Sequence, residues 1–232
     1  MTLTELLARL FPDGHQLAGD NRLFHGEGRT PTGPVAVIGT GESTTIGIAE
    51  IVYLGRSLLR VLRETPGRPV LLLVDNSGQK MAMADELLGL NQYIAHLVQI
   101  QDLARRRGHQ VLALVYGNSI AGGFIAFGLC AGQTYALPES NTSVMNLPAI
   151  ARITKLPLEY LEEVSRTVSV FAPGVENFFR TGGIEDIWSG DLSQCLARAL
   201  GRDQAEDRRA ELGLERGGRP LASQVINRIR HA

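Results

Sequence analysis

Two continuous apolar runs of strand length occupy the middle of the chain, at residues 69–75 and 110–116. A run without polar alternation is typical of a parallel strand that is buried on both faces of its sheet. Apolar residues at helical spacing predict a helix over 47–64, before the first run, and another over about 84–107, between the two. Strands that alternate with helices in this way predict an α/β fold with right-handed crossover connections.

Shorter elements are expected on both sides of this centre. A short amphipathic helix begins the chain, and a Thr/Pro/Gly turn joins two strands at about 22–28 and 34–39. After the second apolar run we expect a helix at 124–131, a short strand at 134–138, and helices near 156–168, 175–181, 191–200, 202–212 and 220–230. The charge density rises from Arg198 onward, which is typical of a solvated helical extension or of a surface that contacts a partner.

The composition fits one globular domain of ordinary size. Of the 232 residues, 44% are hydrophobic and 20% are charged, so the chain can bury a core. The net charge of −1 argues against nucleic acid as a partner. The charge-free stretch 110–138 has the length of a membrane span, but glycines interrupt it, and a strand, a turn and a buried helix fit it better. Because the start shows no signal-peptide pattern, we expect no membrane association and a cytoplasmic location.

The sequence argues against a metal site and against a nucleotide site. Cys130 and Cys195 lie far apart, and neither belongs to a cluster of Cys and His residues, so no metal or disulfide is expected. Residues 39–44 stand between a strand and a helix, but the third glycine of a dinucleotide fingerprint is missing and an acid, Glu42, occupies the segment. We therefore expect the two hydroxyl residues that follow Glu42 to form a turn and a helix cap.

The candidate chemistry lies in two glycine-containing segments, 75–79 and 117–123, which include the ends of the apolar runs. We interpret both as turns at the carboxyl ends of parallel strands, where ligands usually bind. Glycines there leave backbone N–H groups accessible and allow a bound group to approach closely. The alternative is that these glycines only permit tight packing between helix and sheet, and the local pattern leaves both interpretations open.

Two such turns facing each other would form an oxyanion hole. One N–H donor would come from Gly78 or Gln79 and the other from Gly122 or Gly123. Donors placed in this way stabilise negative charge that develops on a thioester or carboxylate oxygen. Lys80 directly follows the first turn, where its charge would neutralise a substrate carboxylate, although a solvated surface lysine is the more ordinary role.

The same segments resemble a known superfamily. Residues 115–128 read Val-Tyr-Gly-Asn-Ser-Ile-Ala-Gly-Gly-Phe-Ile-Ala-Phe-Gly, and together with 135–140 they resemble the second half of the crotonase core, where a glycine segment opens a buried helix. Residues 74–79 are similar to the turn that supplies the other oxyanion donor in that superfamily. The run from 69 to about 188 is similar to carboxyltransferase-type members, and most of all to the gamma subunits of biotin-independent malonate decarboxylases.

This resemblance, which covers about residues 30–190, implies an α/β crotonase-like (ClpP/crotonase) ββα spiral with C-terminal helices. The whole chain, 1–232, would form a single domain in which residues 191–232 are a helical extension. The catalytic residues would be Gly122, Gly123, Gly78 and Gln79, and the substrate-binding candidates beside them are Ser77, Lys80, Asn118 and Ser119.

The resemblance also implies a reaction and partners. The subunit would act with a homologous beta subunit to convert malonyl-S-[acyl carrier protein] to acetyl-S-[acyl carrier protein] and CO2. An acyl carrier protein subunit would carry the acyl group on a CoA-like, phosphopantetheine-type group, and an alpha subunit would exchange the acyl carrier. No cofactor is expected on this chain, and no biotin. The residues leave open which group donates the final proton, and whether the glycine turn faces the thioester or the departing carboxylate.

Peptidase activity is not expected, although Clp-type serine proteases share the superfamily. Their nucleophile lies four residues after the turn glycine, a position that Ala121 occupies here, and no histidine stands in 143–148. Two alternatives to the decarboxylase remain. One is a carboxyltransferase subunit of a biotin-dependent acyl-CoA carboxylase or decarboxylase, and the other is a non-catalytic structural subunit, which the lack of a clear acid or base favours. We expect the helices near 156–181 to pack largely against a partner.

Overall fold

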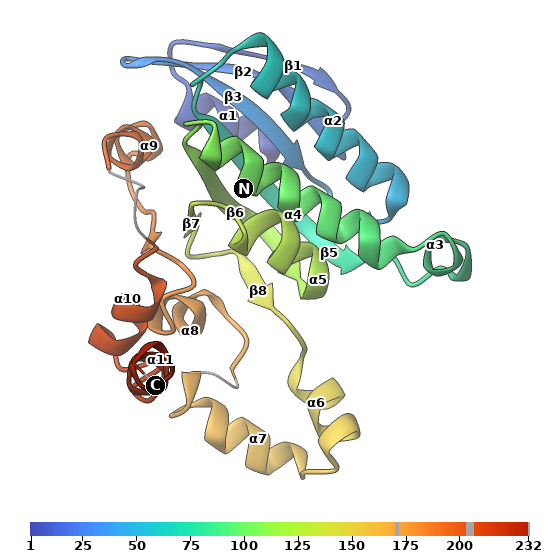
Figure 1. Cartoon of the computed structure of the whole chain (residues 1–232), viewed down its shortest axis with the longest axis vertical. Coiled ribbons are helices and arrows are strands. Elements are labelled where there is room, and N and C mark those ends of the chain that lie inside the picture. The colour runs from blue at the N-terminus through green and yellow to red at the C-terminus, as the bar shows by residue number, and fades with distance from the viewer. Residues whose placement is uncertain (170–171, 203–206, 232) are drawn as a thin grey trace.

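Nine strands form a single sheet in the computed structural model, which describes residues 1–169, 172–202 and 207–231 (Figure 1). The order along the sheet is β1-β2-β3-β5-β6-β7-β9, while β4 pairs with β5 and β8 pairs with β6. The strands are β1 (His15–Gly19), β2 (Leu23–Thr30), β3 (Gly33–Thr40), β4 (Thr44–Ile46), β5 (Val70–Gln79), β6 (Val111–Ile120), β7 (Gln133–Ala136), β8 (Asn141–Ser143) and β9 (Asp186–Ile187). The pairs among β1, β2 and β3 are antiparallel, and all other pairs are parallel.

Helices cover both faces of this sheet. On one face α2 (Ile48–Glu64) lies beside α4 (Leu90–Arg106), and on the other α1 (Leu3–Leu10) packs near α9 (Leu192–Leu200) (Figure 1). The further helices are α3 (Met83–Leu87), α5 (Ala121–Phe124), the π-helical segment η1 (Ile125–Leu129), α6 (Leu147–Thr154), α7 (Leu158–Ser165), α8 (Val175–Arg180), α10 (Arg209–Glu215) and α11 (Ala222–Arg230). No helix in these described parts of the chain has the length and apolarity that a membrane span needs.

The alternation of side chains along β5 explains the two-sided core. Val70, Leu72 and Val74 face the cluster beneath α2 and α4, whereas Leu71 and Leu73 face the cluster beneath α1 and α9. All five side chains are fully buried. Because successive residues of a strand point to opposite faces, an unbroken apolar run is what a strand between two helical layers requires. The predicted α/β class and the buried position of this run are confirmed.

The two segments that we interpreted as turns begin instead as strand. β5 continues to Gln79 and β6 to Ile120, so residues 76–79 and 117–120 are extended. These extensions leave the main path of the sheet, where the register between β5 and β6 shifts, and pair with the short strands β4 and β8. The turn prediction was wrong because pairing with distant segments, rather than local residue preference, holds these polar residues extended.

The predicted helix over 84–107 is divided in the structure. Gly89 has a φ of +84°, a conformation that favours glycine, and it separates α3 from α4. The helix predicted at 124–131 begins earlier, at Ala121, and continues as η1.

The other predicted helices are present, and several short elements were missed. The expected helix 202–212 is described only in part, because residues 203–206 lie outside the described residues and α10 begins at Arg209. Pattern alone did not predict β1, β4, β8, β9 or α6. The hydroxyl residues after Glu42 do not cap a helix either, because β4 intervenes and α2 begins only after Gly47.

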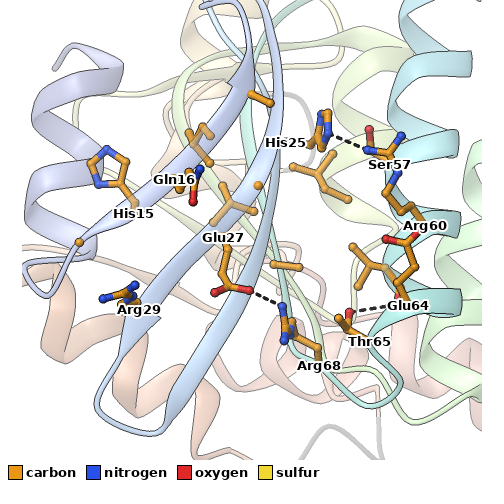
Figure 2. A pocket seen from close by; sticks show the side chains of 18 residues that line it. His15, Gln16, His25, Glu27, Arg29, Ser57, Arg60, Glu64, Thr65 and Arg68 are labelled. Carbon is orange, nitrogen blue, oxygen red and sulfur yellow. Dashed lines mark hydrogen bonds and ion pairs between the residues drawn. The ribbon is translucent and has the colours of Figure 1, made fainter.

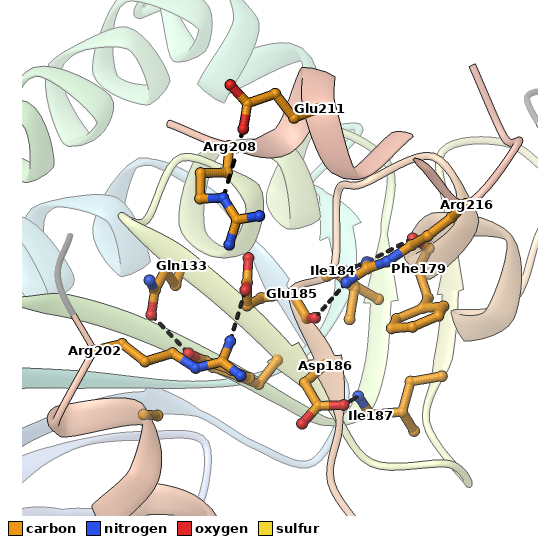
Figure 3. Close-up of polar contacts among 12 residues, drawn as sticks. Gln133, Phe179, Ile184, Glu185, Asp186, Ile187, Arg202, Arg208, Glu211 and Arg216 are labelled. Atoms are coloured by element: carbon orange, nitrogen blue, oxygen red, sulfur yellow. Dashed lines mark hydrogen bonds and ion pairs between the residues drawn. The ribbon is translucent and has the colours of Figure 1, made fainter. Parts of the chain in front are cut away.

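Arginines fasten the C-terminal extension to the rest of the chain (Figure 3). Arg216 donates hydrogen bonds to the carbonyl oxygens of Phe179 and Glu185 at 2.9 Å and of Ile184 at 2.8 Å. Its guanidinium also lies 3.8 Å from the centroid of the Phe179 ring, within cation–π distance. Arg209 donates to two carbonyl oxygens at and just beyond the end of η1, at 2.7 and 2.6 Å. These contacts tie α10 to α8, to the start of β9 and to η1.

Candidate functional site

The two glycine segments meet at one end of the sheet. A Cβ atom added to Gly123 would lie 3.1 Å from the Cα of Gly78, and one added to Gly78 would lie 3.4 Å from the Cβ of Ala121. Gly78, which lies within β5, has a φ of +92°, a conformation that favours glycine. The segments that the sequence singled out therefore lie against each other, although their glycines are more than 40 positions apart.

Backbone strain gathers at the same end of the sheet. Among the described residues other than glycine, Glu42, Ser43, Ala121 and Lys155 have positive φ, and the first three lie where β3 and β6 end. A left-handed conformation is unfavourable for a residue with a Cβ atom, so it persists where the surrounding structure holds it. Such strain is typical of functional sites. Ala121, which takes the position of the Clp-type nucleophile, has no group that attacks a carbonyl.

Two of the predicted oxyanion donors are bonded to side-chain amides. The N–H of Gly122 donates to Oε1 of Gln79 at 2.9 Å, and the N–H of Gly78 donates to Oδ1 of Asn76 at 3.2 Å. Among the described residues, none outside the helix accepts a hydrogen bond from the N–H of Gly123, which lies in the first turn of α5. At the start of this helix, the N–H of Gly122 is therefore occupied by Gln79, whereas the N–H of Gly123 has no acceptor outside the helix among the described residues.

Sequence reasoning missed the roles of these two side chains. We considered the backbone N–H of Gln79 but not its carboxamide, and Asn76 received no role. The Asn76 side chain is fully buried, and a Cβ added to Gly123 would lie 2.5 Å from its Oδ1. The signal available in the sequence was a carboxamide residue on each side of the turn glycine, since Asn and Gln side chains readily accept from backbone N–H groups.

Two predicted substrate-binding residues, Ser77 and Asn118, belong to a polar network around the buried Asp75 side chain that holds the strand extensions together. Oδ1 of Asp75 accepts from the N–H of Asn118 at 2.8 Å, and Oδ2 accepts from the N–H of Ser43 at 3.0 Å. Nδ2 of Asn118 donates to the Ser43 hydroxyl at 2.7 Å, and the Ser77 hydroxyl donates to the Ser43 carbonyl at 2.8 Å. Ser77 and Asn118 thus connect β4, β5 and β6 in this structure.

Ser119 is fully buried and does not reach the surface of the site. It pairs laterally with Asn76 of β5 and with Thr142 of β8, so the three side chains lie in one row across the strands. Each carries a buried polar atom that has no partner among the described residues: Asn76 Nδ2, Ser119 Oγ and Thr142 Oγ1. An unpartnered buried polar group lowers the stability of the fold by about 1–3 kcal/mol, so this row of three side chains is unfavourable for folding.

Lys80 lies at the same end of the sheet, beside the start of α2. Its Nζ is 3.7 Å from Oδ2 of Asp85, and Oδ1 of Asp85 accepts from the N–H of Ile48 at 3.1 Å. The lysine side chain is 52% exposed, so its charge remains accessible to a ligand even though Asp85 partly balances it. No group of three potential metal ligands is present among the residues that the structure describes.

The architecture matches solved carboxyltransferases. A chain of a Pseudomonas malonate decarboxylase hetero-tetramer in complex with coenzyme A superposes with a TM-score of 0.77, at 23% identity over 97% of both chains. Transcarboxylase 12S matches with a TM-score of 0.71, at 16% identity over 86% of this chain and 41% of that chain. The beta subunit of P. aeruginosa geranyl-CoA carboxylase matches with a TM-score of 0.65, at 19% identity over 95% and 43%. The fold is therefore that of the crotonase-like carboxyltransferases, as the resemblance predicted.

Sequence comparison narrows this class to one family. The profile of the malonate decarboxylase gamma subunit (MdcE) matches residues 41–232. The malonyl-S-ACP:biotin-protein carboxyltransferase MADD of Malonomonas rubra is 30% identical in an alignment of length 214 that covers 85% of this chain and 73% of that protein. The chain belongs to the malonate decarboxylase gamma subunit family, and the family predicted from the sequence is confirmed.

Proposed function

We propose that this chain works with a homologous beta subunit to decarboxylate malonyl-S-[acyl carrier protein] to acetyl-S-[acyl carrier protein] and CO2, in a cytoplasmic complex. The observation that carries the proposal is the contact between the β5 segment around Gly78 and the start of α5 at Gly122 and Gly123. Family membership supports the substrate class. We also propose that residues 1–232 form one domain, because α9 contributes Leu196 to the same core cluster as Leu6 of α1.

Decarboxylation breaks the bond between the carboxylate carbon and the α-carbon, and the electron pair moves onto the thioester carbonyl oxygen. The N–H of Gly123, and that of Gly122 once Gln79 moves aside, would stabilise the enolate oxygen. One such donor is worth about 3–4 kcal/mol in the transition state. Lys80, whose side chain is 52% exposed, would balance the charge of the malonyl carboxylate before CO2 departs. The enolate carbon then takes a proton to give the acetyl thioester.

The thioester arm would come from a partner subunit. In this proposal an acyl carrier protein presents its phosphopantetheine-type group, an alpha subunit exchanges the acyl carrier, and biotin has no role. This chain would supply backbone donors rather than a cofactor site. Two apolar side chains, Ile153 of α6 and Tyr160 of α7, are 63% and 51% exposed. Their exposure supports a partner subunit that binds at α6 and α7. The relatives of known structure include a Pseudomonas MdcD–MdcE hetero-dimer.

The proposal predicts CO2 release that needs this subunit and tolerates avidin. The chain is co-expressed with the proposed beta, alpha and acyl carrier subunits, and CO2 release is measured from the malonyl-carrier thioester. We expect release from the complete complex, none when this chain is omitted, and no change when avidin is added. An intact complex that releases no CO2 from this substrate contradicts the proposal.

A biotin-dependent carboxyltransferase is the second candidate. Its support is the 30% identity to the malonyl-S-ACP:biotin-protein carboxyltransferase of Malonomonas rubra, whose name specifies a biotin protein. In that case carboxyl transfer to a biotinyl partner replaces direct loss of CO2, and avidin inhibits turnover. The avidin experiment therefore separates the two candidates in a single assay.

Gln79→Ala is expected to lower the apparent KM for the malonyl-carrier thioester about fivefold. The Gln79 Oε1 occupies the Gly122 N–H at 2.9 Å, so the substrate oxygen must displace it. A neutral hydrogen bond contributes about 1 kcal/mol net, which corresponds to a change of about fivefold. Amide hydrogen exchange at Gly122 should become faster in the unliganded variant, which checks the bond independently of activity.

Gln92→Ala, on an exposed part of α4, is the matched control for this variant and should change neither KM nor exchange at Gly122. A higher KM in Gln79→Ala would contradict the prediction that Gln79 Oε1 and the substrate oxygen compete for the Gly122 N–H. It would indicate instead that Gln79 holds the start of α5 in its working position.

A further inference from the structure

A cavity lies at the other end of the strands, away from the glycine segments. It has a volume of about 710 Å³ and lies between the face formed by β1, β2 and β3 and the C-terminal half of α2 (Figure 2). In the sheet register His25 pairs with Ile38 and Glu27 with Ala36, and Ala36 in turn pairs with Val70, the first residue of β5. The candidate site is built at the opposite end, where β5 finishes, so the two locations are separate.

The cavity combines an apolar floor with charged walls. Ile38 and Val61 belong to the core beneath α2, and both line the cavity. Arg29 and Glu27 of β2 and Arg60 of α2 line its walls. Small-molecule sites are typically concave, of 300–1,000 Å³, and mostly apolar with a few polar groups that fix the orientation of the ligand. The volume of this cavity lies within that range, and its lining combines apolar side chains with a larger share of polar and charged ones than is typical.

His25 holds Arg60 in a defined position on the cavity wall. Nε2 of His25 lies 3.0 Å from Nη1 of Arg60, and Nδ1 lies 2.8 Å from the hydroxyl of Tyr53. A guanidinium only donates, so Nε2 accepts and the imidazole is neutral, with its hydrogen on Nδ1. Burial, with a smaller contribution from the charge of Arg60, lowers the pKa of His25 and favours this neutral form. One N–H of Arg60 is thereby anchored, and its guanidinium forms no other hydrogen bond within the described parts of the chain.

The acids of the cavity are already paired, whereas two of its arginines are not. Glu27 contacts Arg68 in an ion pair, and Glu64 pairs with Arg63 at 3.0 Å. Within the described parts of the chain, neither Arg29 nor Arg60 forms an ion pair. Because Arg29, Arg60 and Arg68 line the cavity together with only Glu27 and Glu64, its lining carries a net positive charge.

We propose that this cavity is a second ligand site, which binds a small anionic metabolite through its carboxylate or phosphate group on Arg60, with the apolar body against Ile38 and Val61. Guanidinium groups match both kinds of oxyanion by paired hydrogen bonds. His25 acts as a positioning residue, because it orients the guanidinium without needing to touch the ligand. The site does not depend on the proposed decarboxylation, since it shares no residue with the glycine segments.

The test is a separate titration of the full chain with each of three anions: adenosine 5′-monophosphate, inorganic phosphate and malonate. Binding is measured by calorimetry and by the NMR signals of the His25 ring. We expect saturable binding of at least one anion with a shift of the His25 signals. Arg60→Ala should weaken that binding at least tenfold, while His25→Ala weakens it less. Arg56→Ala, one turn earlier on α2 and outside the cavity, should change it less than twofold.

Three outcomes would overturn the proposal. None of the three anions binds, or Arg60→Ala binds as well as the unchanged chain, or neutral adenosine binds as tightly as its monophosphate. If the cavity served only to bind a partner protein, none of the three anions would bind. Decarboxylation by the assembled complex is measured in parallel with Arg60→Ala and should be unchanged, so a failure here does not affect the proposed function.

Discussion

Gly123→Ala should lower the rate of malonyl-thioester decarboxylation by the assembled complex at least 100-fold. The added Cβ would lie 2.5 Å from Oδ1 of Asn76 and 3.1 Å from the Cα of Gly78. Asn76 is fully buried and cannot move aside freely, so the start of α5 and the β5 segment around Gly78 must separate. Removal of one oxyanion donor typically costs about 100- to 1,000-fold in kcat, and this separation displaces donors on both segments. The measurement is CO2 release at saturating substrate.

Gly201→Ala is the matched control. A Cβ at Gly201 meets only ordinary contacts, at 3.6 Å or more from the nearest atoms, so this variant should keep the full rate. Size-exclusion chromatography checks that both variants still assemble. If the Gly123→Ala complex assembles and keeps its rate, the chain is a structural partner and the catalytic proposal fails.

Arg216→Ala should reduce the free energy of unfolding by about 3 kcal/mol. The variant loses donors to three carbonyl oxygens at 2.8–2.9 Å and the stacking of the guanidinium on the Phe179 ring. Hydrogen bonds to a charged group contribute about 1.5–3 kcal/mol each, but bonds made by one side chain do not add fully. For a chain of this size the loss corresponds to a fall in Tm of roughly 6–12 °C. Thermal unfolding followed by circular dichroism measures it.

Two control variants separate the cause. Arg208→Ala removes an exposed ion pair with Glu211 at 3.6 Å and should change stability by less than about 0.5 kcal/mol. Arg216→Lys keeps the charge but lacks the planar fork that reaches three carbonyl groups, so it should recover only part of the loss. A full recovery with lysine would show that charge, rather than the hydrogen bonds, holds α10 in place.

The sequence determined the layers of this fold. The apolar runs at the starts of β5 and β6 required burial on both faces, and the amphipathic spacing of α2 supplied one covering layer. The local pattern also marked both glycine segments, and their resemblance to a known superfamily led to the family prediction. These features are readable because strand and helix periodicity is a property of neighbouring residues.

Only the tertiary structure decided how the glycine segments are used. Residues 76–79 and 117–120 are extended because β4 and β8, of three residues each, pair with them from distant parts of the chain. The hydrogen bond of Gln79 with the Gly122 N–H, and those of Arg216 with the Ile184 and Glu185 carbonyl groups just before β9, likewise join residues more than 30 positions apart. Long-range pairing of this kind leaves little local pattern, since its free energy comes from contacts that exist only after the chain has folded.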